Sequence, residues 1–360
     1  MLNLFDFSLP FKAPLKTGMG EFHHRSGIIL HFEDLEINGF SEVSPLPGFS
    51  SETLQHVREE LVRQRDPLDD FLKSDFSIKK LKNLLDSFSG FPSLQFSLSW
   101  LGLLIYCQRN RVTPGETLNI QPAVSLKVNA VIGENDESKI RSQIKTAISE
   151  GFSTLKFKSS GNPEKLAKIL TRVQHNYPDL TFRLDANRSW PLEKLSDYSF
   201  LFRNLPVEYI EEPVRIQNSG ELKKVINECS LNVALDESIT DINKLGQLLQ
   251  AKEKLIFIIK PALFGSVFNL CETISKFKTP VSSIVVTTAL ETSIGRSLVA
   301  ATASLIGSRH MAHGLCTGLF FQKDLAAGYD CKNGILTIPQ QGYWSFSSSH
   351  LNPQHLTRIN

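Results

Sequence analysis

From about residue 125 onward the chain repeats one pattern, a short apolar segment followed by an amphipathic stretch. This alternation, at intervals of about 25 residues, predicts parallel strand–helix–strand units. The apolar segments, which we expect to be strands, span residues 126–132, 154–158, 181–185, 207–211, 233–236, 256–260, 284–288 and, more weakly, 310–315. Eight such strands close naturally into a β/α barrel of the TIM type. A doubly wound open sheet is the alternative, but no glycine-rich phosphate-binding turn follows any segment to favour it.

The first third of the chain follows a different pattern. Between residues 4 and 42, short apolar runs alternate with turn residues, which predicts a small antiparallel sheet. The segment 44–48, Ser-Pro-Leu-Pro-Gly, ends this pattern, and Ser50 or Ser51 is placed to cap a following helix. Further helical segments are expected up to about residue 108. We therefore expect an α+β unit before the barrel.

Charge and composition exclude several classes of function. The 39 Lys and Arg residues nearly balance the 37 Asp and Glu residues, and no basic run is interleaved with aromatic residues, so no nucleic-acid partner is expected. The longest apolar stretch, 100–107, is less than half the length of a membrane-spanning helix, and the N-terminus lacks the features of a secretory signal. The five cysteines are scattered, without metal-site spacing. Together these features predict a cytoplasmic protein with no membrane role.

Ionisable residues stand at the carboxyl ends of five consecutive predicted strands. They are Lys158, Asp185, Glu211, Asp236 and Lys260, separated by 27, 26, 25 and 24 residues. A single acidic residue after a strand usually caps a helix or is solvated. Five in register converge on the mouth of the barrel, where barrel enzymes place their working groups. Burying like charges together there without a function would be costly.

The three acidic residues of this set predict a metal site. Asp185, Glu211 and Asp236 bring three negative charges together, which requires a cation. Ligands that are all oxygen, with no nearby His or Cys, favour Mg²⁺ first and Mn²⁺ second.

The lysines predict acid–base chemistry. Lys156 and Lys158 alternate with Phe157, so both point into the barrel, and their mutual repulsion is expected to lower the pKa of one of them. Lys260 lies across the barrel. A metal flanked by lysines on opposite sides is suited to removing a proton next to a carboxylate. By itself, the Lys-Phe-Lys segment would more often be an edge strand with solvated lysines.

These residues resemble the enolase superfamily, in its muconate-lactonising subgroup, which has a Lys-x-Lys motif and an opposing lysine. More narrowly, the segments 44–50 and 183–190 resemble the o-succinylbenzoate synthase family. The resemblance implies an α/β fold: a modified TIM (β/α)7β barrel with an N-terminal α+β capping domain. It places the cap at residues 1–122, the barrel at 123–325, and a segment returning to the cap at 326–360.

The resemblance also implies the cofactor and its surroundings. Asp185, Glu211 and Asp236 would bind Mg²⁺, with Mn²⁺ as a possible substitute, and Asn187 and Glu237 would support these ligands.

The same resemblance implies a reaction, the dehydration of 2-succinyl-6-hydroxy-2,4-cyclohexadiene-1-carboxylate to o-succinylbenzoate in menaquinone biosynthesis. Lys158 would take the α-proton of this small carboxylate and return it to the departing hydroxide, which makes the elimination syn. Lys260 would stabilise the enediolate from the other face. Lys156 would hold the substrate carboxylate and tune Lys158.

Five further residues are expected to contact the substrate. Arg183 lies two residues before Asp185 and should face the same way. By resemblance, Thr288 would contact the succinyl group, and Gly314 and Leu315 would offer backbone N–H groups to a carboxylate. The stretch 18–27, which carries Arg25, resembles the cap loop that folds over the substrate, although an ordinary hairpin loop is an equal alternative.

Two other functions remain open on the sequence. One is another enzyme of the subgroup, an N-succinylamino acid racemase, a dipeptide epimerase or a cycloisomerase, because racemisation also uses lysines on both faces. The absence of an Asp-x-Asp pair between residues 310 and 330 disfavours a dipeptide epimerase. An additional activity on N-succinylamino acids is compatible with the same residues. The other is a non-catalytic metal-binding barrel, disfavoured because every expected ligand and lysine is present.

Overall fold

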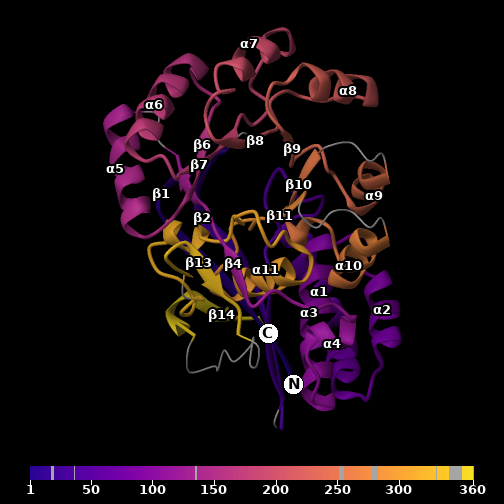
Figure 1. Cartoon of the computed structure of the whole chain (residues 1–360). Coiled ribbons are helices and arrows are strands. Elements are labelled where there is room, and N and C mark those ends of the chain that lie inside the picture. The colour runs from indigo at the N-terminus through magenta and orange to yellow at the C-terminus, as the bar shows by residue number, and fades with distance from the viewer. Residues whose placement is uncertain are drawn as a thin grey trace.

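The computed structural model of the chain consists of a β/α barrel and a smaller α+β cap (Figure 1). It describes residues 1–17, 20–35, 37–133, 136–250, 255–276, 283–329, 331–339 and 351–359. Within these ranges, no helix combines the length and the apolar character needed to cross a bilayer.

The barrel sheet has seven hydrogen-bonded parallel strands, in the order β11-β10-β9-β8-β7-β6-β5. They are β5 (Ala130–Ile132), β6 (Thr154–Lys158), β7 (Thr181–Asp185), β8 (Val207–Glu211), β9 (Val233–Leu235), β10 (Leu255–Ile259) and β11 (Ile284–Val286). The predicted barrel fold is therefore confirmed. Asp236 and Lys260 are the first residues after β9 and β10, so the carboxyl ends of five adjacent strands do carry the five ionisable residues.

The expected first and eighth strands differ from the prediction. The segment 126–132 is divided into β4 (Ser125–Lys127), which joins a separate small sheet, and β5. The weak segment 310–315 forms two isolated parallel bridges, from Val128 to His313 and from Thr287 to Gly314. These two bridges close the barrel because each joins this segment to one of its two neighbours.

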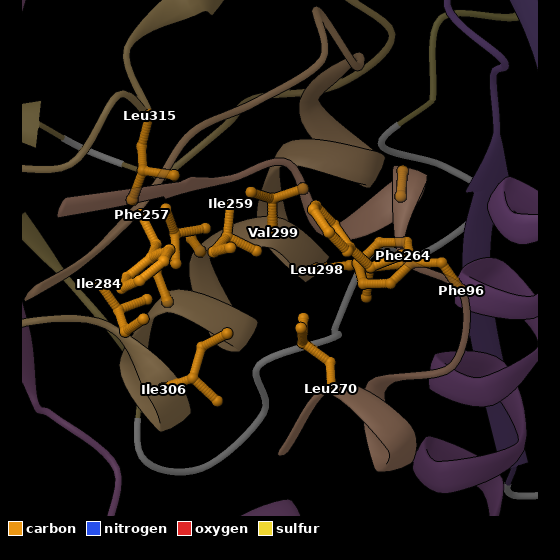
Figure 2. Close-up of a cluster of buried hydrophobic side chains, with 14 of the residues drawn as sticks. Phe96, Phe257, Ile259, Phe264, Leu270, Ile284, Leu298, Val299, Ile306 and Leu315 are labelled. Atoms are coloured by element: carbon orange, nitrogen blue, oxygen red, sulfur yellow. The ribbon is translucent and has the colours of Figure 1, made fainter. Parts of the chain in front are cut away.

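Helices cover the outside of the barrel (Figure 1). They are α5 (Glu137–Ser149), α6 (Pro163–Asn176), η1 (Leu192–Lys194), α7 (Leu195–Phe200), α8 (Ser219–Glu228), α9 (Ile242–Gln250), η2 (Pro261–Leu263), α10 (Val267–Lys276) and α11 (Ser293–Ile306). Asp136, Asn162, Asn218 and Thr292 cap four of them by accepting backbone N–H groups. Their apolar faces pack on the strands, as Figure 2 shows for Phe257 and Ile284 against Ile306.

The cap combines a four-stranded antiparallel sheet, in the order β14-β1-β2-β3, with helices. Its elements are β1 (Leu2–Thr17), β2 (Gly20–Asp34), β3 (Ile37–Val43), α1 (Leu54–Lys73), α2 (Ile78–Asp86), α3 (Pro92–Asn110) and α4 (Pro114–Leu118). The expected loop at 18–27 is, in its described part, strand β2, because Gly20 to Phe22 pair with β1. The side chain of Thr53 caps α1, whereas that of Ser50 accepts a bond from the Leu46 N–H in the preceding turn.

The end of the chain contacts both parts of the molecule. Its elements are η4 (Thr317–Phe320), β12 (Cys331–Lys332), β13 (Ile335–Thr337), η6 (Pro353–His355) and β14 (Leu356–Arg358). Strand β13 pairs with β4 at the start of the barrel, whereas β14 pairs with β1 in the cap sheet. Figure 1 accordingly shows the two termini close together. The domain boundaries given above remain predictions.

The cap and barrel share buried contacts. Helix α3 is buried along almost its whole length, and Figure 2 shows its Phe96 beside Phe264 and Leu298 of the barrel. In a second contact between cap and barrel, the carboxylate of Glu42 in the cap accepts N–H groups of Thr292 and Gly295 at the start of α11. The cap is therefore held firmly over the carboxyl ends of the strands.

A buried histidine holds the closing segment of the barrel. His313 is 0% exposed. Its Nδ1 accepts the Val286 N–H at 3.0 Å, and its Nε2 donates to the Ser308 carbonyl at 2.9 Å. The first bond requires an unprotonated Nδ1 and therefore the neutral ring, and burial lowers the pKa of His313 to about 4.

This lowered pKa predicts acid sensitivity. The unfolded state binds the proton below about pH 6.5, while the folded state binds it only near pH 4, so stability falls as the pH decreases between these values. We expect a loss of about 2 kcal/mol from this group between pH 7 and pH 5. Urea unfolding at both pH values would measure it. A His313→Gln variant should lose this part of the pH dependence, and His56→Gln, at an exposed position on α1, is the control. An unchanged pH dependence in His313→Gln would contradict the assignment.

Candidate active site

Lysine and carboxylate side chains alternate across the carboxyl ends of the barrel strands. In the β6–β7 ladder Lys158 pairs with Asp185, and in the β7–β8 ladder Asp185 pairs with Glu211. Asp185, Glu211 and Asp236 are 2%, 2% and 9% exposed. The strand register thus brings side chains that are far apart in the sequence into one buried row.

Lys156 lies between two of these carboxylates. Its ammonium group donates to both Glu211 oxygens, at 2.8 and 2.7 Å, and lies 2.9 Å from Asp185 Oδ2. Phe157 points to the opposite face of β6, where its ring meets Phe182 edge-on. The two lysines of the Lys-Phe-Lys segment therefore share the inner face, since Lys158 also contacts Asp185.

Lys158 is the most accessible of the three lysines, with 33% of its side chain exposed against 18% for Lys156 and 12% for Lys260. Its ammonium group donates to Asp185 Oδ2 at 2.9 Å and to Asn187 Oδ1 at 2.7 Å. The Asn187 amide donates in turn to Glu237 Oε1 at 3.2 Å. Lys158, Asn187 and Glu237 are thus linked in a chain of hydrogen bonds.

Lys260 occupies the other end of the row. Its ammonium group contacts both oxygens of Asp236, one of them at 2.6 Å. It also lies 4.9 Å from the centre of the Phe49 ring, which belongs to the cap. The cap segment that follows β3 therefore reaches the barrel mouth. Phe49 belongs to the segment 44–50 that carries the resemblance, but it was not among the residues expected in the site.

The pKa values of these groups reflect one coupled charge cluster. Burial alone would lower the pKa of Lys156, but Asp185 and Glu211 outweigh it and raise the pKa well above its ordinary value. The same balance, with Asp236 as partner, raises the pKa of Lys260. The predicted lowering of the pKa by repulsion between the two lysines therefore does not apply to Lys156. Attraction to its two carboxylate partners is stronger than this repulsion.

The carboxylates respond in opposite directions. Burial would raise the pKa of Asp185, but Lys156 and Lys158 hold it well below its usual range. For Glu211, burial, opposed by Lys156 and supported by Asp185 and Asp236, raises the pKa to about 8. Glu211 thus lies between two like charges that its neighbouring lysine does not fully neutralise.

This cluster suits an added cation, with one structural condition. Among the described residues, no three His, Cys, Asp or Glu side chains lie together in a form that could hold a metal ion as they stand. In the structure the oxygens of Asp185, Glu211 and Asp236 face the ammonium groups of Lys156, Lys158 and Lys260. The donor set, all carboxylate oxygen, fits a hard divalent ion. A bound ion would compete for these oxygens with all three ammonium groups.

Three residues beside the cluster have left-handed backbones. Asn187, Arg188 and Glu212 have φ angles of 44°, 61° and 42°. This conformation costs about 1–2 kcal/mol for a residue other than glycine, so the surroundings must enforce it. Such strain is concentrated at functional sites, and here it directly follows strands β7 and β8.

Arg183 lies inside the barrel and away from the mouth. Its side chain is 0% exposed. The guanidinium donates to Glu208 at 2.7 Å, to the Ala312 carbonyl at 2.7 Å and to Asn129 at 3.2 Å, and it stacks 4.7 Å from the Tyr209 ring centre. The Arg183 side chain faces the same way as Asp185, as expected, but its guanidinium already donates to acceptors of the protein itself. This placement does not support a substrate contact and gives Arg183 a structural role in the barrel interior.

Arg25 joins the cap to the barrel. It is 4% exposed and donates to the carbonyls of Ser44 and Pro45 in the cap and of Ala289 and Leu290 in the barrel. A cavity of about 340 Å³ lies beside it. Because four carbonyls already surround its guanidinium, the structure does not support the predicted substrate contact through this group.

The remaining expected contacts lie together where the barrel closes. Thr288 Oγ1 is 2.8 Å from Thr317 Oγ1. The Gly314 N–H donates to the Val286 carbonyl at 3.0 Å and is not available to a ligand. In the described part of the chain no acceptor is recorded for the Leu315 N–H, so of the two expected backbone donors only Leu315 fits that role.

The chain is thus a capped β/α barrel with a row of buried lysines and carboxylates at the carboxyl ends of its strands. The sequence matches the family described as Enolase C-terminal domain-like over residues 139–342, more than half of the chain. It also matches the family described as MenC, N-terminal domain, over residues 1–101. The chain belongs to the Enolase C-terminal domain-like family and is an enzyme of the enolase superfamily.

The relatives narrow this class. An o-succinylbenzoate synthase of Desulfotalea psychrophila is 24% identical over 357 residues, covering 92% of this chain and 96% of that protein. The solved o-succinylbenzoate synthase of Thermosynechococcus elongatus BP-1, with Mg in its active site, has a TM-score of 0.71 at 22% identity, covering 90% of this chain and 94% of that one. The expected resemblance to o-succinylbenzoate synthases is thus confirmed.

Similarity of fold extends to the rest of the subgroup. The muconate lactonizing enzyme of Pseudomonas fluorescens, solved with muconolactone, has a TM-score of 0.83 at 16% identity, covering 99% of this chain and 97% of that one. This score exceeds that of the synthase. The backbone alone therefore does not distinguish the activities of the subgroup.

Proposed function

We propose that this enzyme is an o-succinylbenzoate synthase, which dehydrates 2-succinyl-6-hydroxy-2,4-cyclohexadiene-1-carboxylate to o-succinylbenzoate with Mg²⁺, or Mn²⁺ in its place. The observation that carries the proposal is the pair of ammonium groups, Lys158 and Lys260, which flank buried carboxylates on opposite sides of the mouth. Relatives of that name, which cover 92% and 83% of this chain, support it. A place in menaquinone biosynthesis and in the cytoplasm belongs to the same proposal.

Asp185, Glu211 and Asp236 would hold the divalent ion. When bound, the ion supplies positive charge beside the substrate carboxylate, which lowers the energy of the dianionic form of that group. Asn187 and Glu237 would orient this set, since Asn187 donates its backbone N–H to Asp185 Oδ1 at 3.1 Å and its side-chain amide to Glu237.

Lys158 is the candidate base. Its Nζ, as the neutral amine, would take the proton from the carbon next to the carboxylate, so that a C–H bond breaks and an N–H bond forms. The same ammonium then gives a proton to the ring hydroxyl as the C–O bond breaks, water leaves and the ring becomes aromatic. Because one residue serves both steps, the proton and the hydroxyl leave from the same face. Its exposure is greater than that of the other two lysines, which fits contact with the substrate.

Lys260 and Lys156 would act by charge. Lys260, held at Asp236 under the Phe49 ring, would face the reacting carbon from the opposite side and stabilise the negative charge that develops there. Lys156, whose pKa is raised, stays protonated and would attract the substrate carboxylate.

A single-turnover ultraviolet measurement tests this function. Mixing the Mg²⁺-loaded protein with the cyclohexadiene carboxylate is expected to produce the absorbance of an aromatic ring, because only dehydration creates one. The control is the same protein treated with a chelator. No aromatic product, together with interconversion of N-succinylamino acid or dipeptide stereoisomers, would favour a racemase or epimerase. Metal binding with neither reaction would favour the non-catalytic barrel.

A further inference from the structure

The side chain of Glu212, which follows the candidate ligand Glu211, is fully buried yet lies outside the lysine–carboxylate row. Its φ of 42° ends the regular alternation of β8. Glu211 and Glu212 are therefore two acidic neighbours with different surroundings: the first meets Lys156, and the second meets the loops that follow the adjacent strands.

The Glu212 carboxylate accepts four hydrogen bonds, which use its full capacity. Oε1 accepts the backbone N–H groups of Asp236 at 2.9 Å and Ser238 at 2.7 Å. Oε2 accepts Arg188 Nε at 2.9 Å and the Ser238 hydroxyl at 2.9 Å. The charge of Glu212 is balanced by Arg188, which is itself 26% exposed.

These bonds connect three consecutive strand ends. On one side, Asp236 is the candidate ligand after β9. On the other side, Arg188 follows Asn187, the residue that contacts Lys158. The backbone N–H of Arg188 donates to the Glu212 carbonyl at 2.7 Å. Glu212 thus bonds directly to both neighbouring loops, and each of those loops carries groups of the lysine–carboxylate row.

We propose that Glu212 is a positioning residue, which fixes the loops after β7, β8 and β9 so that Asp185, Glu211 and Asp236 can bind one divalent ion. For catalysis this inference rests on the proposed function, whereas its metal-binding part stands without it. Glu212 makes no contact with the ammonium groups of the row, and it acts through the backbone of Asp236 and the side chain of Arg188.

The ionised form of the side chain is essential to this role. All four partners are donors, so a glutamine of the same shape would direct its NH₂ group at a backbone N–H or at Arg188. It would also leave the Arg188 guanidinium without its buried counter-charge. Glu212→Gln therefore disturbs the three loops while adding or removing almost no volume.

Mn²⁺ binding without substrate, followed by electron paramagnetic resonance, is the decisive measurement. We expect Glu212→Gln to raise the Kd for Mn²⁺ by about 10–100-fold and to lower kcat more than it raises KM. Ser238→Ala, which removes one of the four bonds, should have a smaller effect. The control is Glu221→Gln, on α8 of the same strand–helix unit. The Glu221 carboxylate accepts the Gln217 N–H and makes none of the four bonds described for Glu212.

Amide hydrogen exchange provides a second measurement that needs neither metal nor substrate. In Glu212→Gln the amides of Asp236 and Ser238 should exchange at least about 10-fold faster, while amides of the cap sheet keep their wild-type rates. A variant with a lower Tm but wild-type Kd for Mn²⁺ and wild-type exchange at these two amides would overturn the proposal. A wild type that binds Mn²⁺ but makes no aromatic product would refute the proposed function and leave this test valid.

Discussion

Lys158→Ala is expected to lower kcat roughly 10⁴-fold, the upper end of what one general acid–base group contributes. The large effect follows from the double role proposed for this lysine, which both removes the proton and returns it. A Lys158→Arg variant should be nearly as inactive, because a guanidinium keeps the charge but does not act as a base near neutral pH. Single-turnover ultraviolet kinetics would measure both variants.

Metal binding should survive this substitution. The Lys158 ammonium contacts Asp185 Oδ2 at 2.9 Å and so competes with a cation for that oxygen. We therefore expect Lys158→Ala to bind Mn²⁺ at least as tightly as the wild type. Lys168→Ala, at an exposed position on α6, is the control for the loss of a lysine. Full turnover in Lys158→Ala would remove the base assignment.

The barrel was accessible to sequence reasoning because its signal is local and repeated. Each strand is a short apolar run, and an ionisable residue marks its end. The spacing alone therefore predicted that Asp185 and Glu211 lie at the same level, at the carboxyl ends of their strands. The eighth strand gave a weak signal because it forms only single bridges at His313 and Gly314.

The roles of neighbouring polar residues could not be predicted in the same way. Glu212 and Arg25 owe their environments to backbone groups from distant segments, such as the Asp236 N–H and the Leu290 carbonyl. Backbone groups carry no sequence signal. Arg183 was expected at the mouth because strand alternation fixes the direction of a side chain but not its depth. The depth of Arg183 is set by side-chain partners such as Glu208, the residue of β8 that is skipped where the register shifts and whose carboxylate accepts the Arg183 Nε–H.

The charge balance of the site also depends on distances that spacing does not give. Repulsion between Lys156 and Lys158 was a sound expectation for two isolated lysines. In the structure both ammonium groups lie 2.9 Å from Asp185 Oδ2, so attraction to carboxylates determines the outcome for Lys156. The alternation of three ammonium groups with three carboxylates is what keeps these six ionisable groups close together.

Glu211→Gln is expected to weaken Mn²⁺ binding roughly 10³-fold, which corresponds to about 4 kcal/mol. Glu211 lies between Asp185 and Asp236, whose charges, after burial, raise its pKa to about 8. The neutral, isosteric amide therefore resembles a form that the buried site already tolerates, and folding should be preserved.

Chelation and titration together complete this test. Wild-type protein dialysed against EDTA should lose turnover to background and recover it with Mg²⁺, while Glu211→Gln should recover little at the same Mg²⁺ concentration. Glu193→Gln, exposed before α7, controls for the lost charge. The Lys156 ammonium also contacts Asp185, at 2.9 Å, so we expect it to keep a counter-charge in the variant. A loss of Mn²⁺ affinity would then report on the ligand itself rather than on collapse of the row. Unchanged affinity in Glu211→Gln would contradict the assignment of Glu211 as a metal ligand. Full turnover after EDTA would contradict the need for a divalent ion.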